Sequence, residues 1–162
     1  MLKGEKVNIF ILDENPKTCA KYHCDKHVIK MILESAQMLS TVSRLNGGEA
    51  GYKPTHKNHP CTKWAGQSLT NWFWLQTLTK HLNEEYIYRY NKEENHKSYE
   101  VAQTLVVPNI PVLGLTKFAQ AMPDQYKNSN PVTAYRNYYL KEKTDLLYWK
   151  NRPTPKWVTS AL

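Results

Sequence analysis

Basic side chains recur at short intervals in the stretch YHCDKHVIK, which begins at residue 22. It carries four cationic or potentially cationic groups at three- and four-residue spacings: His23, Lys26, His27 and Lys30. Such spacings bring side chains to one face of a helix. Because imidazolium and ammonium groups make charge-assisted hydrogen bonds to anions, this face is predicted to bind phosphate.

A second basic stretch, YKPTHKNHP, begins at residue 52 and leads into an expected helix that starts at Pro60. The free N–H groups at the start of a helix, at the positive end of its dipole, favour an anion. The two stretches form one site if the helices that carry them are antiparallel neighbours. The phosphate-binding residues predicted from the second stretch are Tyr52, Lys53, His56, Lys57, His59 and Lys63.

Acid–base chemistry is possible in the first stretch, since an imidazole can gain or lose a proton near neutral pH. We predict His27 or His23 as the acid–base group and Asp25 as the carboxylate that orients it. The two histidines could instead hold a metal ion with a third ligand from the second stretch. The neighbouring lysines disfavour a dication, so neither a metal nor another cofactor is expected.

The C-terminal part of the chain, residues 126–157, interleaves aromatic with basic residues. In nucleic-acid-binding proteins, cations hold the phosphate backbone while rings stack on bases. Arg136 and Lys141 are therefore predicted to contact nucleic acid. For aromatic residues that share a helix face, such as Tyr135 and Tyr139, packing in the core is the favoured interpretation.

The net charge of +8 is distributed unevenly along the chain. Residues 1–65 hold ten Lys/Arg and six Asp/Glu, residues 126–162 hold seven and two, and the middle holds five and six. If the two basic ends meet, they form a positive surface, although solubility alone is the simpler explanation. The three cysteines are expected to be reduced thiols. With no signal peptide or long apolar run, the chain is expected to be cytoplasmic, with no membrane partner.

The pattern predicts a mainly α fold, one domain over residues 1–162 with a basic aromatic C-terminal segment. A short extended segment is expected at Val7–Leu12, an apolar run of β-branched and aromatic type. Asparagine followed by proline, at residues 15–16 and 130–131, is typical of a capped helix start. A bundle of about four helices follows, over residues 16–46, 60–90, 99–106 and 132–149.

The order of these elements resembles the phage pyrimidine-dimer DNA glycosylases of the endonuclease V type. The similar features are the apolar first segment, the long helix, the His-Pro loop, the aromatic helix ending in EEYIYRYN, and the segment AYRNYYLKEK. The chain also resembles small phage-encoded proteins that carry the signatures YHCDKHVIKM, HKNHPCTKW and AMPDQYK.

The resemblance to the glycosylases implies an all-α fold, a basic surface that faces DNA, and a Schiff-base mechanism. The implied nucleophile is the N-terminal amine, exposed after removal of Met1 and assisted by a glutamate early on the first helix. In this sequence Leu2 follows Met1, and the helix position nearest that glutamate carries Asp25.

Two hypotheses follow for function. The leading one is a nucleic-acid-binding, DNA-base-processing protein that uses the His/Lys cluster. The alternative is a non-enzymatic binder, possible as a homodimer, that sequesters a phosphorylated nucleotide signal in an anti-defence role. If His23 and His27 bind as imidazolium, affinity is expected to weaken between about pH 6 and pH 8.

Overall fold

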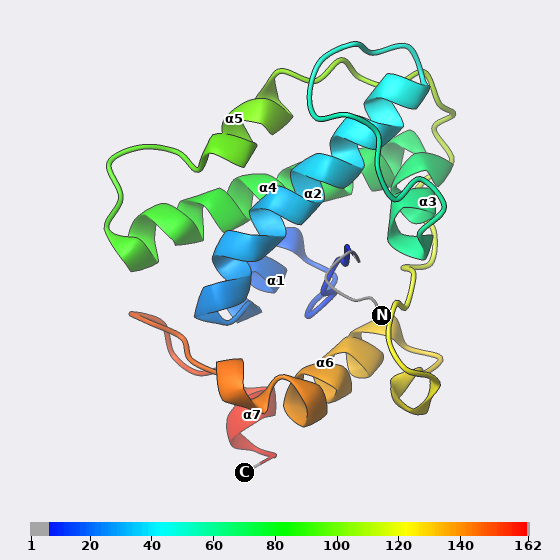
Figure 1. Ribbon diagram of the computed structural model, residues 1–162. Coiled ribbons are helices and arrows are strands. Elements are labelled where there is room, and N and C mark those ends of the chain that lie inside the picture. The colour runs from blue at the N-terminus through cyan, green and yellow to red at the C-terminus, as the bar shows by residue number, and fades with distance from the viewer. Residues whose placement is uncertain (1–6, 162) are drawn as a thin grey trace.

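The computed structural model describes residues 7–161, and every regular element within this range is helical (Figure 1). The α-helices are α1 (Pro16–Tyr22), α2 (Asp25–Leu45), α3 (Pro60–Gln67), α4 (Leu69–Tyr90), α5 (Lys97–Gln103), α6 (Pro131–Glu142) and α7 (Lys156–Thr159). Two 3-10 turns, η1 (Asp124–Tyr126) and η2 (Thr144–Leu146), flank α6. The mainly α prediction is confirmed. The predicted number of about four helices is wrong, since seven occur in the described part of the chain.

The capped helix starts are as predicted. The side chain of Asn15 accepts hydrogen bonds from the N–H groups of Lys17 and Thr18, and Pro16 opens α1. Asn130 accepts hydrogen bonds from two N–H groups of α6 in the same way. Each cap satisfies donors that have no partner inside the helix.

The first expected helix is interrupted at His23 and Cys24, whose ψ angles of 134° and 162° are extended. Side chains from distant parts of the chain bind the carbonyls at this break. Arg89 donates to the carbonyls of Lys21 and His23, and the indole of Trp149 donates to that of Tyr22. The expectation of one continuous helix is therefore wrong, and tertiary contacts stabilise the interruption.

The second expected helix is also divided, at Ser68, which is extended and separates α3 from α4. The Ser68 hydroxyl accepts hydrogen bonds from the N–H groups of Thr70 and Leu113, so it caps α4 and holds the long loop after α5. The predicted end of this region at Tyr90 is confirmed, because Asn91 adopts a left-handed conformation there.

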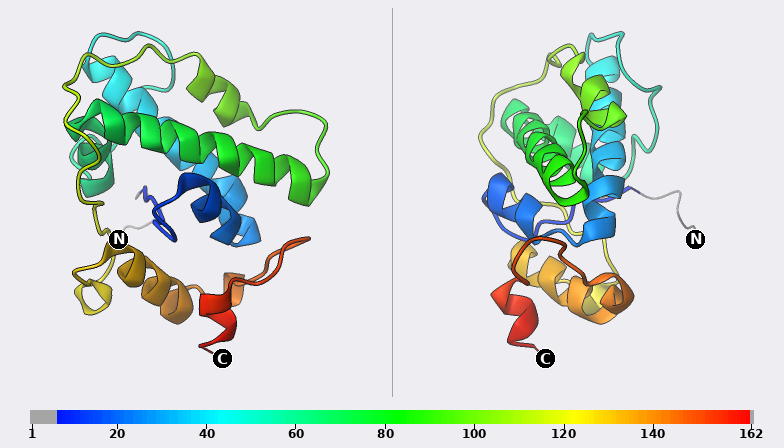
Figure 2. Two further views of the ribbon diagram at one scale, coloured as in Figure 1. Left: turned by 180° about the vertical axis from the view of Figure 1, so that it is seen from behind. Right: turned by 90° about the vertical axis from the view of Figure 1, so that its left-hand side faces the viewer.

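The N-terminal segment Val7–Leu12, which has no regular secondary structure, lies between the upper helices and α6 (Figures 1 and 2). Its apolar side chains are almost completely buried, so it joins the core rather than covering it. Above it, α2 crosses α4, and α1 packs against α4. Below it lie α6 and the C-terminal turns. Hydrogen bonds from Tyr135 to Asn8 and from Arg136 to Leu12 join α6 to this segment.

A buried ionic network joins α4 to the start of α2. The fully buried guanidinium of Arg89 binds Glu85 at 3.0 Å and Asp25 at 3.1 Å, and Arg152 binds Glu85 at 2.8 Å.

Arg89→Met is expected to lower the free energy of unfolding by about 3–5 kcal/mol, because it leaves buried carboxylate and carbonyl groups without a donor. Urea denaturation measures this loss. Arg152→Met, at a partly exposed partner, is the control and should cost less; equal losses would contradict the prediction.

Within residues 7–161, no helix is both long enough and apolar enough to cross a membrane.

Candidate active site

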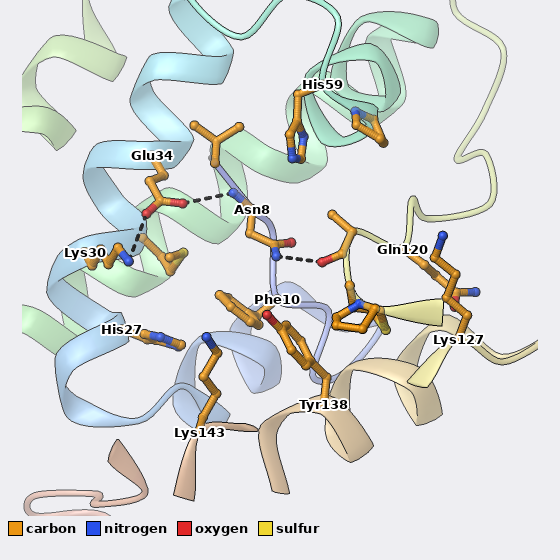
Figure 3. A pocket seen from close by; sticks show the side chains of 16 residues that line it. Asn8, Phe10, His27, Lys30, Glu34, His59, Gln120, Lys127, Tyr138 and Lys143 are labelled. Carbon is orange, nitrogen blue, oxygen red and sulfur yellow. Dashed lines mark hydrogen bonds and ion pairs between the residues drawn. The ribbon is translucent and has the colours of Figure 1, made fainter. Parts of the chain in front are cut away.

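A cavity of about 610 Å³ opens where the N-terminal segment, α2, the start of α3, the loop before α6, and α6 meet. Figure 3 shows side chains from all of these elements pointing into it. The charged and polar residues of its wall are Asn8, His27, Lys30, Glu34, His59, Gln120, Lys127, Tyr138 and Lys143.

Glu34 is the acidic residue of this wall, and only 6% of its surface is exposed. One carboxylate oxygen accepts a hydrogen bond from the N–H of Asn8 at 2.9 Å, and the other lies 3.7 Å from Lys30 Nζ. Burial raises the pKa of Glu34 from 4.5 to about 7, although the charge of Lys30 and the Asn8 hydrogen bond partly oppose the shift. A carboxyl group with this pKa can take up and release protons at neutral pH.

Asn8 fixes the N-terminal segment against two other walls of the cavity. Its amide nitrogen donates to the carbonyl of Ala121 at 2.9 Å, and its side-chain oxygen accepts from the Tyr135 hydroxyl at 2.8 Å. Together with its backbone bond to Glu34, Asn8 links α2, the loop before α6, and α6 itself. This linkage holds the carboxylate in place relative to the opposite wall.

The floor of the cavity is aromatic. The ring of Phe10 stacks on His27 with centroids 4.5 Å apart, and Tyr138 lies nearly parallel to Phe10 at 6.1 Å. The ammonium of Lys143 lies 5.1 Å from the Tyr138 centroid. Flat rings beside cations suit a nucleobase and its phosphates, because any base offers a face for stacking.

The predicted acid–base histidines are both buried. His23 Nδ1 donates to the carbonyl of Cys19 at 2.8 Å, and His27 Nδ1 bonds to the Tyr139 hydroxyl at 2.7 Å. Burial lowers the pKa of His23 to about 4 and that of His27 to about 2. These shifts favour neutral imidazoles near pH 7, and of the two histidines only His27 lies in the wall of the cavity.

Imidazole NMR signals of His23 and His27 are expected to stay unchanged from pH 8 to pH 5, because both folded-state pKa values lie below this range. The signals are assigned by replacing each histidine in turn. A titration midpoint near 6.5 for either residue would contradict its burial in the neutral form.

Asp25 stands at the start of α2, away from the cavity wall. Its Oδ1 accepts hydrogen bonds from Arg89 at 3.1 Å and from the backbone N–H of Lys150 at 2.8 Å. These partners hold the carboxylate in the ionic network of α4 rather than beside an imidazole. Its predicted role as the group that orients a histidine is not supported by its contacts.

The predicted phosphate-binding residues are distributed over several surfaces. Lys30 and His59 border the cavity, and His59 also caps α3 by accepting the N–H of Cys61. Tyr52 is partly buried, and its hydroxyl bonds to Ser98 near α5. His56, partly exposed in the loop before α3, has a left-handed φ of 51°. The remaining lysines are exposed and outside the cavity wall: Lys26, Lys53, Lys57, Lys63 and Lys141.

Arg136 is engaged within the protein. It donates to the carbonyl of Leu12 at 2.9 Å, lies 3.3 Å from Asp13, and covers the rings of Tyr22 and Trp157. These contacts explain its position as a link between α6 and the N-terminal part of the fold. The core interpretation of the aromatic residues Tyr135 and Tyr139 is confirmed, since both are fully buried.

The residues that line the cavity were only partly predicted from the sequence. His27, Lys30 and Glu34 follow one another at three- and four-residue spacing, so their common helix face was readable from the sequence. Asn8, Tyr138 and Lys143 carry no such signal, because only the tertiary fold brings them to this face.

Two other expectations concern a metal ion in the site and the nucleophile of the reaction. Within residues 7–161, no cluster of three or more His, Cys, Asp or Glu side chains is arranged to hold a metal ion. The N-terminal amine that the resemblance implies as nucleophile belongs to residues 1–6, outside the described residues.

Comparison with known protein families relates this chain to one of them. The family model for pyrimidine dimer DNA glycosylase matches residues 7–98, which is more than half of the sequence. Searches of curated proteins and of solved structures found no match. The matched region includes the segment with Asn8, helix α2 with Glu34, and the start of α3 with His59. The chain therefore belongs to the pyrimidine dimer DNA glycosylase family.

Proposed function

We propose that this protein is a DNA glycosylase that binds damaged DNA and cleaves the N-glycosidic bond of a pyrimidine nucleotide held in the cavity. The observation that carries the proposal is Glu34, a buried carboxyl group with a pKa of about 7 that faces a cavity of about 610 Å³. That volume lies within the range of about 300–1,000 Å³ typical of small-molecule sites. Membership of the glycosylase family supports the same reaction.

Glu34 acts as the acid–base group of the proposed reaction. In its ionised form it accepts a proton from the attacking nucleophile and then returns that proton to the departing pyrimidine. A pKa near the working pH makes both transfers possible, and positioned acid–base groups typically contribute about 10²–10⁴-fold to a rate. The backbone N–H of Asn8 stabilises the ionised carboxylate between the two transfers.

DNA binding is assigned to the cations around the cavity. Lys30 and Lys127 are exposed at its edge, and His59 lies at its upper rim (Figure 3). The exposed lysines Lys57 and Lys63 extend the positive surface outward from the start of α3. A nucleotide turned out of the duplex would stack on the rings of Phe10 and Tyr138 while these cations bind its phosphates.

The test is a salt titration of binding to three duplexes, one with a single cyclobutane pyrimidine dimer, one with an abasic site and one undamaged. Each duplex is also incubated with the protein, and alkali then reveals any abasic product. Steep salt dependence with cleavage at the dimer supports the proposal. Weak duplex binding that a small free nucleotide abolishes would contradict it and favour the nucleotide-sequestering alternative.

The rate of glycosidic cleavage is expected to increase as the pH rises through about 7, because the reaction begins with ionised Glu34. Single-turnover rates on the dimer duplex between pH 5.5 and pH 8.5, at constant ionic strength, measure this dependence. A rate that falls across the same interval would show that the protonated carboxyl is the required form.

A further inference from the structure

The exposed face of α2 is a stripe of side chains that phosphate binding explains only in part. All residues of this helix belong to the described part of the chain, and those exposed before its last turn are Lys26, Ile29, Lys30 and Leu33. Their spacings of three and four residues place them on one face of the helix. This stripe combines two cations with two large aliphatic side chains and carries no carboxylate.

Lys30 joins the stripe to the cavity. It belongs to the cavity wall, yet its side chain is 61% exposed, with Nζ 3.7 Å from a carboxylate oxygen of Glu34. Leu33 follows Lys30 by three residues and directly precedes Glu34, so the stripe runs along the outer edge of the wall that α2 forms (Figure 3). A duplex that places a nucleotide beside Glu34 therefore lies against this edge.

The aliphatic side chains of the stripe are unusually accessible for this helix. Ile29 is 37% exposed and Leu33 is 39% exposed, whereas Val28 and Ile32 on the opposite face are fully buried. Single exposed aliphatic residues are common on protein surfaces, but here two stand with two lysines on one helix face. A partner that removes them from water gains binding free energy, because the burial of apolar surface is favourable.

Duplex DNA matches both kinds of side chain in the stripe. Lysines suit its phosphates, and aliphatic side chains of DNA-bending proteins enter between base pairs from the minor groove and partly unstack them. Opening a base pair costs least where the base is damaged or already poorly paired. An aliphatic wedge can therefore select a lesion by the ease with which the duplex deforms there, without contacts that identify a base.

We propose that Leu33, supported by Ile29, is a wedge that α2 inserts into the duplex beside the pyrimidine dimer, while Lys26 and Lys30 bind the neighbouring phosphates. This inference rests on the proposed function, because it concerns how the same site selects damaged DNA. Leu33 is a positioning residue in this account: it bends the duplex and so brings the damaged nucleotide to Glu34.

Binding and bending of the same two duplexes, one with a single pyrimidine dimer and one undamaged, test the wedge. Every protein carries Glu34→Gln, so that the strands stay intact, and dyes at the duplex ends report bending by energy transfer. Adding Leu33→Ala is expected to weaken binding to the dimer duplex by about tenfold, as expected when part of a buried leucine side chain is lost. Bending should decrease with it, while affinity for the undamaged duplex changes little.

Two further variants separate insertion from a general effect on the protein. Leu33→Met keeps a long apolar side chain, so it should retain both the preference for the dimer duplex and the bending. Leu45→Ala removes a leucine that is 55% exposed at the far end of α2, and it should change neither. Alanine is the best helix former, so both alanine variants should keep the fold, which circular dichroism checks.

Equal losses of affinity for the damaged and the undamaged duplex in Leu33→Ala would overturn the wedge, as would unchanged bending. Loss of a protein dimer in sedimentation, with DNA binding unchanged, would also overturn it and assign the stripe to a second copy of this chain. These results leave the proposed function intact. A parent protein that does not distinguish the two duplexes contradicts the proposed function itself, and the wedge with it.

Discussion

Glu34→Gln is expected to reduce the rate of N-glycosidic cleavage in a pyrimidine-dimer duplex by about 10²–10⁴-fold, the usual contribution of a positioned acid–base group. The amide has nearly the shape of the carboxyl group and can still accept the Asn8 N–H, but it cannot carry a proton between nucleophile and leaving group. DNA affinity should change little, since the cations of the cavity remain. Single-turnover cleavage and equilibrium binding measure the two effects separately.

The matched control is Glu49→Gln, which removes a carboxylate from the exposed loop after α2. It should retain the wild-type rate. Equal activity of the Glu34 and Glu49 variants would remove Glu34 from the chemistry.

The pH dependence of stability provides an independent check of the raised pKa of Glu34. Its folded-state pKa is raised from 4.5 to about 7, so the folded protein binds the proton more tightly than the unfolded chain does. The free energy of unfolding therefore decreases as pH rises from about 4.5 to 7, and above pH 7 the full cost of ionising the buried carboxyl is present. Glu34→Gln should consequently be more stable than wild type at pH 8, by about 1–3 kcal/mol. A catalytic group that costs stability behaves in this way.

Reversing two charges, Lys30→Glu together with Lys63→Glu, is expected to weaken DNA binding by about 10–100-fold at low salt. Both lysines are exposed, so the fold should persist. Each lost phosphate contact also reduces the slope of log affinity against log salt by about 0.9, which makes the slope the more specific measurement.

The control for this change reverses two lysines of the opposite part of the fold, Lys80 on α4 and Lys97 at the start of α5, which are also exposed. This variant carries the same net charge. If it loses as much affinity as the Lys30/Lys63 variant, binding depends on total charge, and the cavity is not where DNA binds.

Local signals in the sequence were sufficient to predict several helix ends. The pairs Asn15–Pro16 and Asn130–Pro131 carry their own cap and a residue already suited to the first helical position. The interruptions at His23 and Ser68 could not be predicted in this way. The first depends on Arg89 and Trp149, which lie far along the chain and replace hydrogen bonds that a continuous helix would make.

The candidate site, too, was predictable from the sequence only where local spacing determines it. The basic stretch of α2 was correctly singled out, but its chemistry was assigned to histidines whose burial the local pattern does not reveal. The spacing places Glu34 on the face of His27 and Lys30, but its burial and its hydrogen bond with the N–H of Asn8 depend on the tertiary fold. Lys143 and Tyr138 enter the cavity only because α6 packs beneath the N-terminal segment. Homodimer formation remains a prediction that no observation tests.

The most direct measurement is the single-turnover cleavage of the N-glycosidic bond at one cyclobutane dimer in a duplex, compared between wild type and Glu34→Gln and read out by alkali cleavage. If the cavity around Glu34 is the active site, wild type cleaves the dimer strand, the variant binds it without cleaving it, and the undamaged duplex stays intact. Cleavage by the variant at the wild-type rate, or no cleavage by either protein, would contradict the assignment.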